Sequence, residues 1–140
     1  MKLLLAVTAS AAMLVAAAPA PPADITGLWA TGSNDGRVQI YRCGAALCGR
    51  VVDAAPLRAD PDRRDIRNAD PKLRERRLKG LVVLQGFTGG PTDWKGGPVY
   101  DPETGSGASK GYLKLRPDGK LEIKGCVAFF CRTKVWTRAG

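Results

Sequence analysis

The chain has no histidine among its 140 residues. This absence excludes a serine–histidine–aspartate or cysteine–histidine nucleophile and a histidine-ligated zinc site, and it removes the commonest general base. The chain also lacks amphipathic helical periodicity of useful length, and it has no basic helix with interleaved aromatic residues. The sequence therefore indicates neither histidine-dependent catalysis nor nucleic-acid binding, and it predicts no cofactor and no metal.

Long apolar runs are also scarce, and the longest one lies at the N-terminus. A positively charged start is followed by an apolar stretch from Leu3 to Ala17 and then by small residues and prolines, which is typical of a secretory signal peptide. A retained membrane anchor would need roughly 20 apolar residues, and this stretch is shorter. We expect residues 1–23 to be a signal peptide cleaved between Ala17 and Ala23. Residues 24–140 are then expected to form one exported domain, periplasmic or secreted, with no transmembrane segment after signal removal.

Cysteine is sparse, but its positions are informative. The four cysteines form two pairs, each with four intervening residues, and they are Cys43, Cys48, Cys126 and Cys131. An even number of cysteines in an oxidising compartment favours disulfides, and four intervening residues suit a hairpin loop. We predict Cys43–Cys48 and Cys126–Cys131 disulfides, with cross-pairing between the hairpins as the alternative. The spacing also permits a four-thiolate zinc site, which export makes the weaker interpretation.

Alternation of apolar and polar residues dominates the rest of the chain. Between Arg37 and Cys43, the side chains of Val38 and Ile40 are expected on one face and their neighbours on the other. Similar short strands recur as far as the C-terminus, most of them joined by tight turns. About eight such strands in a chain of this size predict an all-β fold, either a closed or nearly closed antiparallel barrel or a sandwich.

Charge is unbalanced: 22 Lys and Arg residues stand against 13 Asp and Glu residues, for a formal net charge of +9. Nine of the basic residues lie in residues 54–79, a long polar excursion after the first hairpin that also holds five acidic residues and three prolines. One short helix is expected there, with Asp70 as its N-cap and Pro71 in its first turn. Because the acidic residues offset about half of the positive charge, we interpret this excursion as a solvated loop. The alternative is a surface that binds anionic lipid or cell-wall polymer.

A tryptophan stands early in the first expected strand, in Gly27-Leu28-Trp29, and Arg138 stands at the end of the last strand. This arrangement resembles the closure signature of lipocalin-like barrels, in which the first tryptophan plugs one end and an arginine of the last strand lies across it. Pairing of the first and last strands removes both sheet edges, and a guanidinium stacked on an indole contributes ~0.5–2 kcal/mol. The resemblance implies that Gly27, Trp29 and Arg138 close a lipocalin-like barrel.

A wider set of motifs covers nearly all of residues 24–140. The chain contains, in this order, GLWAT, CGAALCGRVVD, NADPKLRERRLKGLVVLQGF, DWKGGPVYDPETG, LEIKGC and VWTR. Together they are similar to a bacterial family of exported proteins classed only as a domain of unknown function (twenty-one forty-seven). The resemblance implies a small lipocalin-like β-barrel exported beyond the inner membrane, with no established activity and a suspected small apolar ligand.

Candidate ligand contacts lie on the expected inner face or at the mouth of the barrel. Trp94 and Tyr100, which stand among glycines, could form an aromatic platform at the mouth or pack in the core. Whether the apolar lumen is filled or holds one small ligand is left open by the residues themselves. The residues expected to contact a ligand are Trp94, Tyr100, Val38, Ile40, Leu113 and Leu115.

The function predicted first is the binding of a small hydrophobic molecule, such as a fatty acid, by burial of its apolar surface. The alternative is an envelope interaction module that binds anionic lipid or cell-wall polymer through the basic excursion. A carboxylate-dependent enzyme built on Asp93, Asp101 and Glu103 is a third hypothesis. An Asp-Pro-Glu-Thr-Gly segment, however, more often forms a turn in which the aspartate accepts backbone N–H groups. We therefore expect no enzymatic activity, and the oligomeric state is not predicted.

Overall fold

The computed structural model describes residues 3–15 and 24–140. Residues 3–15 contain no helix or strand and are exposed. The expected cleavage interval, from Ala17 to Ala23, lies outside the described residues, so the signal peptide stays a prediction. In the part of the chain that the structure describes, no helix combines the length and the apolar character needed to cross a membrane.

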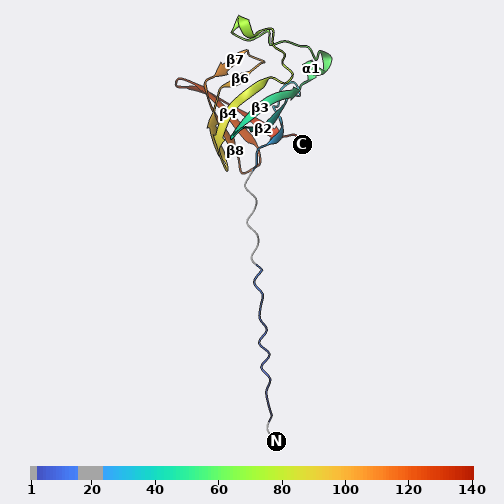
Figure 1. The fold of residues 1–140 in the computed structure, drawn as a ribbon, viewed down its shortest axis with the longest axis vertical. Coiled ribbons are helices and arrows are strands. Elements are labelled where there is room, and N and C mark those ends of the chain that lie inside the picture. The colour runs from blue at the N-terminus through green and yellow to red at the C-terminus, as the bar shows by residue number, and fades with distance from the viewer. Residues whose placement is uncertain (1–2, 16–23) are drawn as a thin grey trace.

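Within residues 24–140, ten strands form one antiparallel sheet (Figure 1). Their bounds are β1 (Gly27–Ala30), β2 (Arg37–Cys43), β3 (Ala46–Asp53), β4 (Val82–Gly89), β5 (Asp93–Gly96), β6 (Val99–Asp101), β7 (Ser106–Ala108), β8 (Lys110–Leu115), β9 (Leu121–Val127) and β10 (Phe130–Arg138). Because β1 pairs with β10 and β3 pairs with β4, the sheet closes through the order β3-β2-β1-β10-β9-β8-β5-β4. The predicted all-β fold, a closed antiparallel barrel of about eight strands, is confirmed.

Strands β5 to β8 are two halves of one bent hairpin. β5 pairs with β8 and β6 pairs with β7 in a continuous register, from Asp93 opposite Lys114 to Asp101 opposite Ser106. The hairpin bends at Gly97, where φ is 140°. A Cβ at this position would lie 2.3 Å from the carbonyl oxygen of a residue on the facing strand segment, so the bend requires glycine. The two short strands β6 and β7 continue the hairpin beyond this bend.

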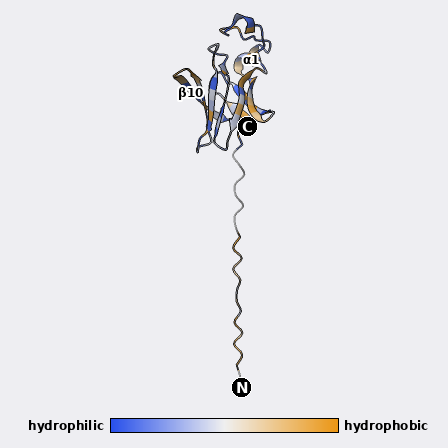
Figure 2. Cartoon of the chain, turned by 60° about the vertical axis from the view of Figure 1, so that its left-hand side comes forward, coloured by the Kyte–Doolittle hydropathy of each residue, from blue (hydrophilic) through white to orange (hydrophobic). Residues whose placement is uncertain are grey.

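Antiparallel connections alternate between the two ends of the barrel. One end, which we call the open end, carries the β1–β2, β6–β7 and β9–β10 turns together with residues 54–79, which we call the lid segment (Figure 1). The opposite, closed end carries the β2–β3, β4–β5 and β8–β9 turns. Much of the lid segment is hydrophilic (Figure 2).

Trp29 fills the closed part of the barrel. Its side chain is fully buried, and its Nε1 donates a hydrogen bond to the carbonyl oxygen of Ile25 at 2.9 Å. The guanidinium of Arg138 lies 4.2 Å from the centroid of the Trp29 ring. The same guanidinium donates to the carbonyl oxygens of Thr26 and Asp24 at 2.9 and 2.8 Å. Because Trp29 and Arg138 are also register partners of β1 and β10, this pair joins the first strand to the last.

Gly27 contributes to the same closure through its backbone. Its φ is 119°, a conformation that residues with a side chain rarely adopt. A Cβ at Gly27 would lie at an ordinary contact distance, 3.5 Å, from Nη1 of Arg138. The backbone conformation of Gly27, and not a lack of space, therefore calls for glycine.

Two disulfides fasten hairpins at opposite ends of the barrel. Cys43–Cys48 joins β2 to β3 at the closed end, and Cys126–Cys131 joins β9 to β10 at the open end. The predicted pairing within each hairpin is confirmed, and the described residues include no free cysteine. The cross-paired alternative and the zinc interpretation are wrong.

We predict that Trp29→Ala lowers the free energy of unfolding by about 3–5 kcal/mol, because it removes a fully buried aromatic side chain. Urea denaturation followed by circular dichroism measures this change. Val135→Ala, at an exposed position of β10, is the control and should change stability by less than about 0.5 kcal/mol. A loss of only a few tenths of a kcal/mol for Trp29→Ala would show that this tryptophan does not seal the barrel.

Candidate functional site

A cavity of about 500 Å³ lies in the barrel on the side of the open end. Two small residues, Gly125 and Ala108, stand on its wall and pack closely, since a Cβ at Gly125 would lie only 3.1 Å from the Cβ of Ala108. Its volume falls within the range of small-molecule sites. The large apolar side chains along its wall are Val38, Val51, Leu57, Ile66, Leu78, Val83, Leu84, Val99, Ile123, Val127, Phe130 and Trp136.

Basic side chains surround the mouth of this cavity. They are Arg37 of β2, Arg63, Arg64 and Arg67 of the lid segment, and Arg132 and Lys134 of β10. Three carboxylates, those of Asp53, Asp101 and Glu103, also line the cavity. Lys134 pairs with Asp101, with Nζ and Oδ2 at 2.6 Å. Among the described residues, neither Arg63 nor Arg132 forms an ion pair with a carboxylate. Six basic side chains against three carboxylates leave a net positive charge around the cavity.

A buried carboxylate holds the lid segment over the mouth. The side chain of Asp65 has no exposed surface, and it accepts hydrogen bonds from Arg76 Nε and Asn68 Nδ2, each at 2.9 Å. The hydroxyl of Tyr100, from β6, donates to the other carboxylate oxygen. The guanidinium of Arg76 also lies 5.1 Å from the centroid of the Tyr100 ring. Because the charge of Asp65 is paired and hydrogen-bonded despite its burial, this cluster fixes the lid segment to the barrel.

The β6–β7 turn provides a second attachment for the lid segment. The backbone N–H of Ala69 donates to the carbonyl oxygen of Gly105 at 3.0 Å, and Arg67 Nη1 donates to that of Glu103 at 2.8 Å. Gly105 has a φ of 74°, and a Cβ there would lie 1.6 Å from the carbonyl oxygen of Arg67. The lid segment is therefore not the freely solvated loop that the sequence indicated, because polar contacts tie it to the barrel.

The lid segment itself contains only two short helices. Helix α1 (Ala55–Ala59) buries Leu57. The helix predicted after Asp70 is a single 3-10 turn, η1 (Pro71–Leu73), and the Asp70 side chain caps it by accepting from the backbone N–H of Lys72 at 3.0 Å. Regular structure therefore contributes little to the position of the lid segment, which depends on its contacts with β6 and β7.

Trp136 lines the cavity with its ring and keeps its polar atom buried within the wall. Its side chain is 7 % exposed. Its Nε1 is buried and, among the described residues, has no hydrogen-bond partner. Trp136 was not among the ligand contacts expected from the sequence. The alternation along β10, which places Phe130, Arg132 and Lys134 on the same face as Trp136, could have identified it.

Two of the six predicted ligand contacts line the cavity, namely Val38 and Tyr100. The Tyr100 hydroxyl is already engaged with the lid segment. The other four predicted contacts do not line this cavity and instead belong to, or pack against, the core around Trp29; they are Trp94, Ile40, Leu113 and Leu115. Trp94 is not at the mouth, because β5 sets it opposite Leu113 in the part of the hairpin before the bend.

The three carboxylates considered for catalysis are not brought together as a site. Asp93 begins β5 near the closed end, whereas Asp101 and Glu103 lie at the β6–β7 turn of the open end. Asp101 accepts from the backbone N–H of Glu103 at 3.0 Å, as a turn residue does. Glu103 accepts from Ser33 and Asn34 at 2.9 and 2.7 Å. In the described parts of the chain, no group of three or more potential ligands among His, Cys, Asp and Glu could hold a metal ion.

The stability of the folded state should depend on the ionisation of Tyr100. Burial, and then the hydrogen bond to Asp65, raise the pKa of Tyr100 to about 12. The neutral phenol therefore stabilises the folded state fully below about pH 10, the pKa of a free tyrosine, and this contribution is lost as the pH rises towards 12. Ultraviolet titration of the phenolate should show one late step near pH 12, and Tyr100→Phe should abolish that step. If the late step persists in Tyr100→Phe, the hydroxyl does not hold the lid segment.

Comparison with known proteins identifies a family for this chain and a similar solved structure. A search of curated proteins finds no match. The structure is similar to one described as "Protein HP1028 from the human pathogen Helicobacter pylori belongs to the lipocalin family", with a TM-score of 0.69, 21% sequence identity and 84% of each chain covered. This likeness supports the lipocalin-like fold. Residues 27–138 match the family model described as "Uncharacterized protein conserved in bacteria (DUF2147)", and the chain belongs to this family.

Proposed function

We propose that this protein is exported and binds a small acidic molecule with an apolar body in its barrel. The cavity of about 500 Å³ with an apolar wall and a basic mouth is the observation that carries the proposal. Export is supported by the predicted signal peptide at residues 1–23 and by the two disulfides, which form and persist in oxidising compartments. A fatty acid is the simplest ligand of this kind.

The apolar wall would supply most of the affinity. Each methylene that leaves water contributes roughly 0.8 kcal/mol, so a medium-length alkyl chain offsets the cost of association. The walls come from strands of a closed sheet, and the cavity is therefore formed before a ligand arrives, which reduces the entropy lost on binding.

The basic mouth would select the head group. Arg63 and Arg132 lie at the mouth without a carboxylate partner among the described residues. A carboxylate or other anion there would gain charge-assisted hydrogen bonds. An amine of the same chain length would meet repulsion from like charges. The head group then lies at the mouth and the chain points towards the barrel interior.

Filling the cavity should abolish binding. Val83 lines the cavity, whereas its neighbour Val82, the register partner of exposed Arg50, does not. We predict that Val83→Phe lowers the affinity for a fluorescent fatty acid by at least about tenfold, because the added ring takes up ligand volume. Val82→Phe adds the same ring at a position that does not line the cavity and should bind as the parent does. Fluorescence titration measures both, and native mass spectrometry of the exported protein shows whether a ligand co-purifies.

Thermal unfolding shows whether each variant is folded. If Val83→Phe does not fold, Ala108→Leu, which fills the same cavity from another strand, replaces it. A folded, cavity-filled variant that binds the probe with unchanged affinity would contradict the proposal, as would tighter binding of dodecylamine than of dodecanoate.

A further inference from the structure

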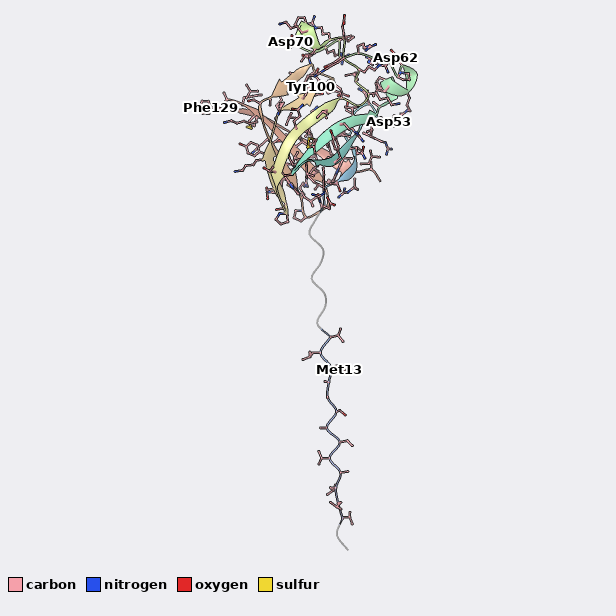
Figure 3. All side chains as sticks on the ribbon, in the orientation of Figure 1. Met13, Asp53, Asp62, Asp70, Tyr100 and Phe129 are labelled. Atoms are coloured by element: carbon pink, nitrogen blue, oxygen red, sulfur yellow. A yellow bond between two sulfur atoms is a disulfide. The ribbon has the colours of Figure 1, made fainter. Side chains whose placement is uncertain are left out.

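The β9–β10 turn exposes apolar side chains beyond the cavity, at the tip of the hairpin. We call residues 127–130 the hairpin tip. Val127 is 56 % exposed, Phe129 is fully exposed and Phe130 is 65 % exposed. Phe129 lies at the far end of the hairpin and away from the barrel (Figure 3). Aromatic side chains ordinarily bury most of their surface, so such a cluster marks an interaction site.

The hairpin tip is held in shape before it meets a partner. The Cys126–Cys131 disulfide joins the two strands directly behind it. The tip turns at Ala128, where φ is 53°, and β9 and β10 are register-paired from Val127 opposite Phe130 onwards. Because the disulfide and the strand pairing restrict the turn, its aromatic side chains lose little backbone entropy when they are buried.

Positive charge flanks the hairpin tip. Lys110 is the register partner of Cys126 across β8 and β9, Arg132 follows Cys131, and Lys124 lies two residues before Cys126. All three are exposed, and none of them pairs with a carboxylate among the described residues. The apolar hairpin tip and the basic residues around it, which lack carboxylate partners, together complement a partner with a negatively charged surface and an apolar interior.

We propose that the hairpin tip docks this protein on a lipid bilayer that contains anionic lipids. Phe129 and Phe130 enter the interfacial region, where aromatic side chains are favoured. Lys110, Lys124 and Arg132 lie against the anionic head groups, to which basic residues near a membrane surface are attracted. The tip offers three apolar side chains on one turn, whereas a stable protein interface needs roughly 800 Å² from each partner. A bilayer is therefore a better occupant than a protein.

Docking at this position would bring the cavity to the bilayer. Val127, Phe130 and Arg132 belong to the hairpin and also line the cavity. A molecule that leaves the bilayer beside the tip would thus meet the mouth of the cavity directly. This consequence rests on the proposed function, but the docking itself does not.

Co-sedimentation of the chain from residue 24 onward with vesicles tests the docking. We expect binding to vesicles of phosphatidylcholine mixed with phosphatidylglycerol, weaker binding to phosphatidylcholine alone, and a decrease with added salt. The double variant Phe129→Ser and Phe130→Ser should lose about tenfold or more in vesicle affinity, because it removes the inserted apolar surface. Leu73→Ser is the matched control, since Leu73 is an exposed apolar residue of the lid segment and lies outside the tip.

Three outcomes would overturn the proposal. The first is a tip variant that binds vesicles as well as the parent does. The second is a loss of vesicle binding in Leu73→Ser, which would assign the surface to the lid segment. The third is a dimer, detected by light scattering, that the tip variant alone dissociates. The cavity-filling variant Val83→Phe separates the two proposals. It should still bind vesicles, so that loss of ligand binding and loss of docking are observed independently.

Discussion

The structure depends on the pairing of its first strand with its last. Only two register pairs join β1 to β10, Trp29 with Arg138 and Ala30 with Thr137. Two register pairs form a short seam. The stacked guanidinium, its hydrogen bonds to the chain before β1 and the buried indole reinforce this seam. Without this seam the sheet has two free edges and no lumen. The cavity, its mouth and the position of the lid segment all presuppose a closed barrel.

Closure alone does not leave a cavity, because an eight-stranded barrel is narrow enough for side chains to fill it. The distribution of large and small residues decides the outcome. Trp29, Trp94 and Phe87 fill the core on the closed side, whereas Ala108 and Gly125 stand on the wall of the open side. The space at the other end follows from this asymmetry.

Local rules could predict much of this fold, and contacts between distant residues account for the rest. Strand alternation, turn residues and the cysteine spacing act over a few positions, so the strands and both disulfides followed from the sequence. The anchoring of the lid segment joins Asp65 to Tyr100, residues 35 apart, and nothing near either residue signals the other. The sequence left open whether Trp94 lies at the mouth or in the core, because its depth in the barrel depends on the bend at Gly97 and cannot be derived from alternation.

The attachments at the open end indicate where a ligand would enter. The lid segment is tied to the β6–β7 turn by the Asp65 cluster and by backbone hydrogen bonds at Gly105, and Glu103 of that turn holds the β1–β2 turn. The β9–β10 hairpin, by contrast, is joined to these elements by the single ion pair between Lys134 and Asp101 among the described side-chain contacts. An exposed ion pair of this kind contributes little, about 0–1 kcal/mol. Separating the hairpin from the lid segment therefore costs less than lifting the lid from β6, and the least costly entrance lies beside the hairpin.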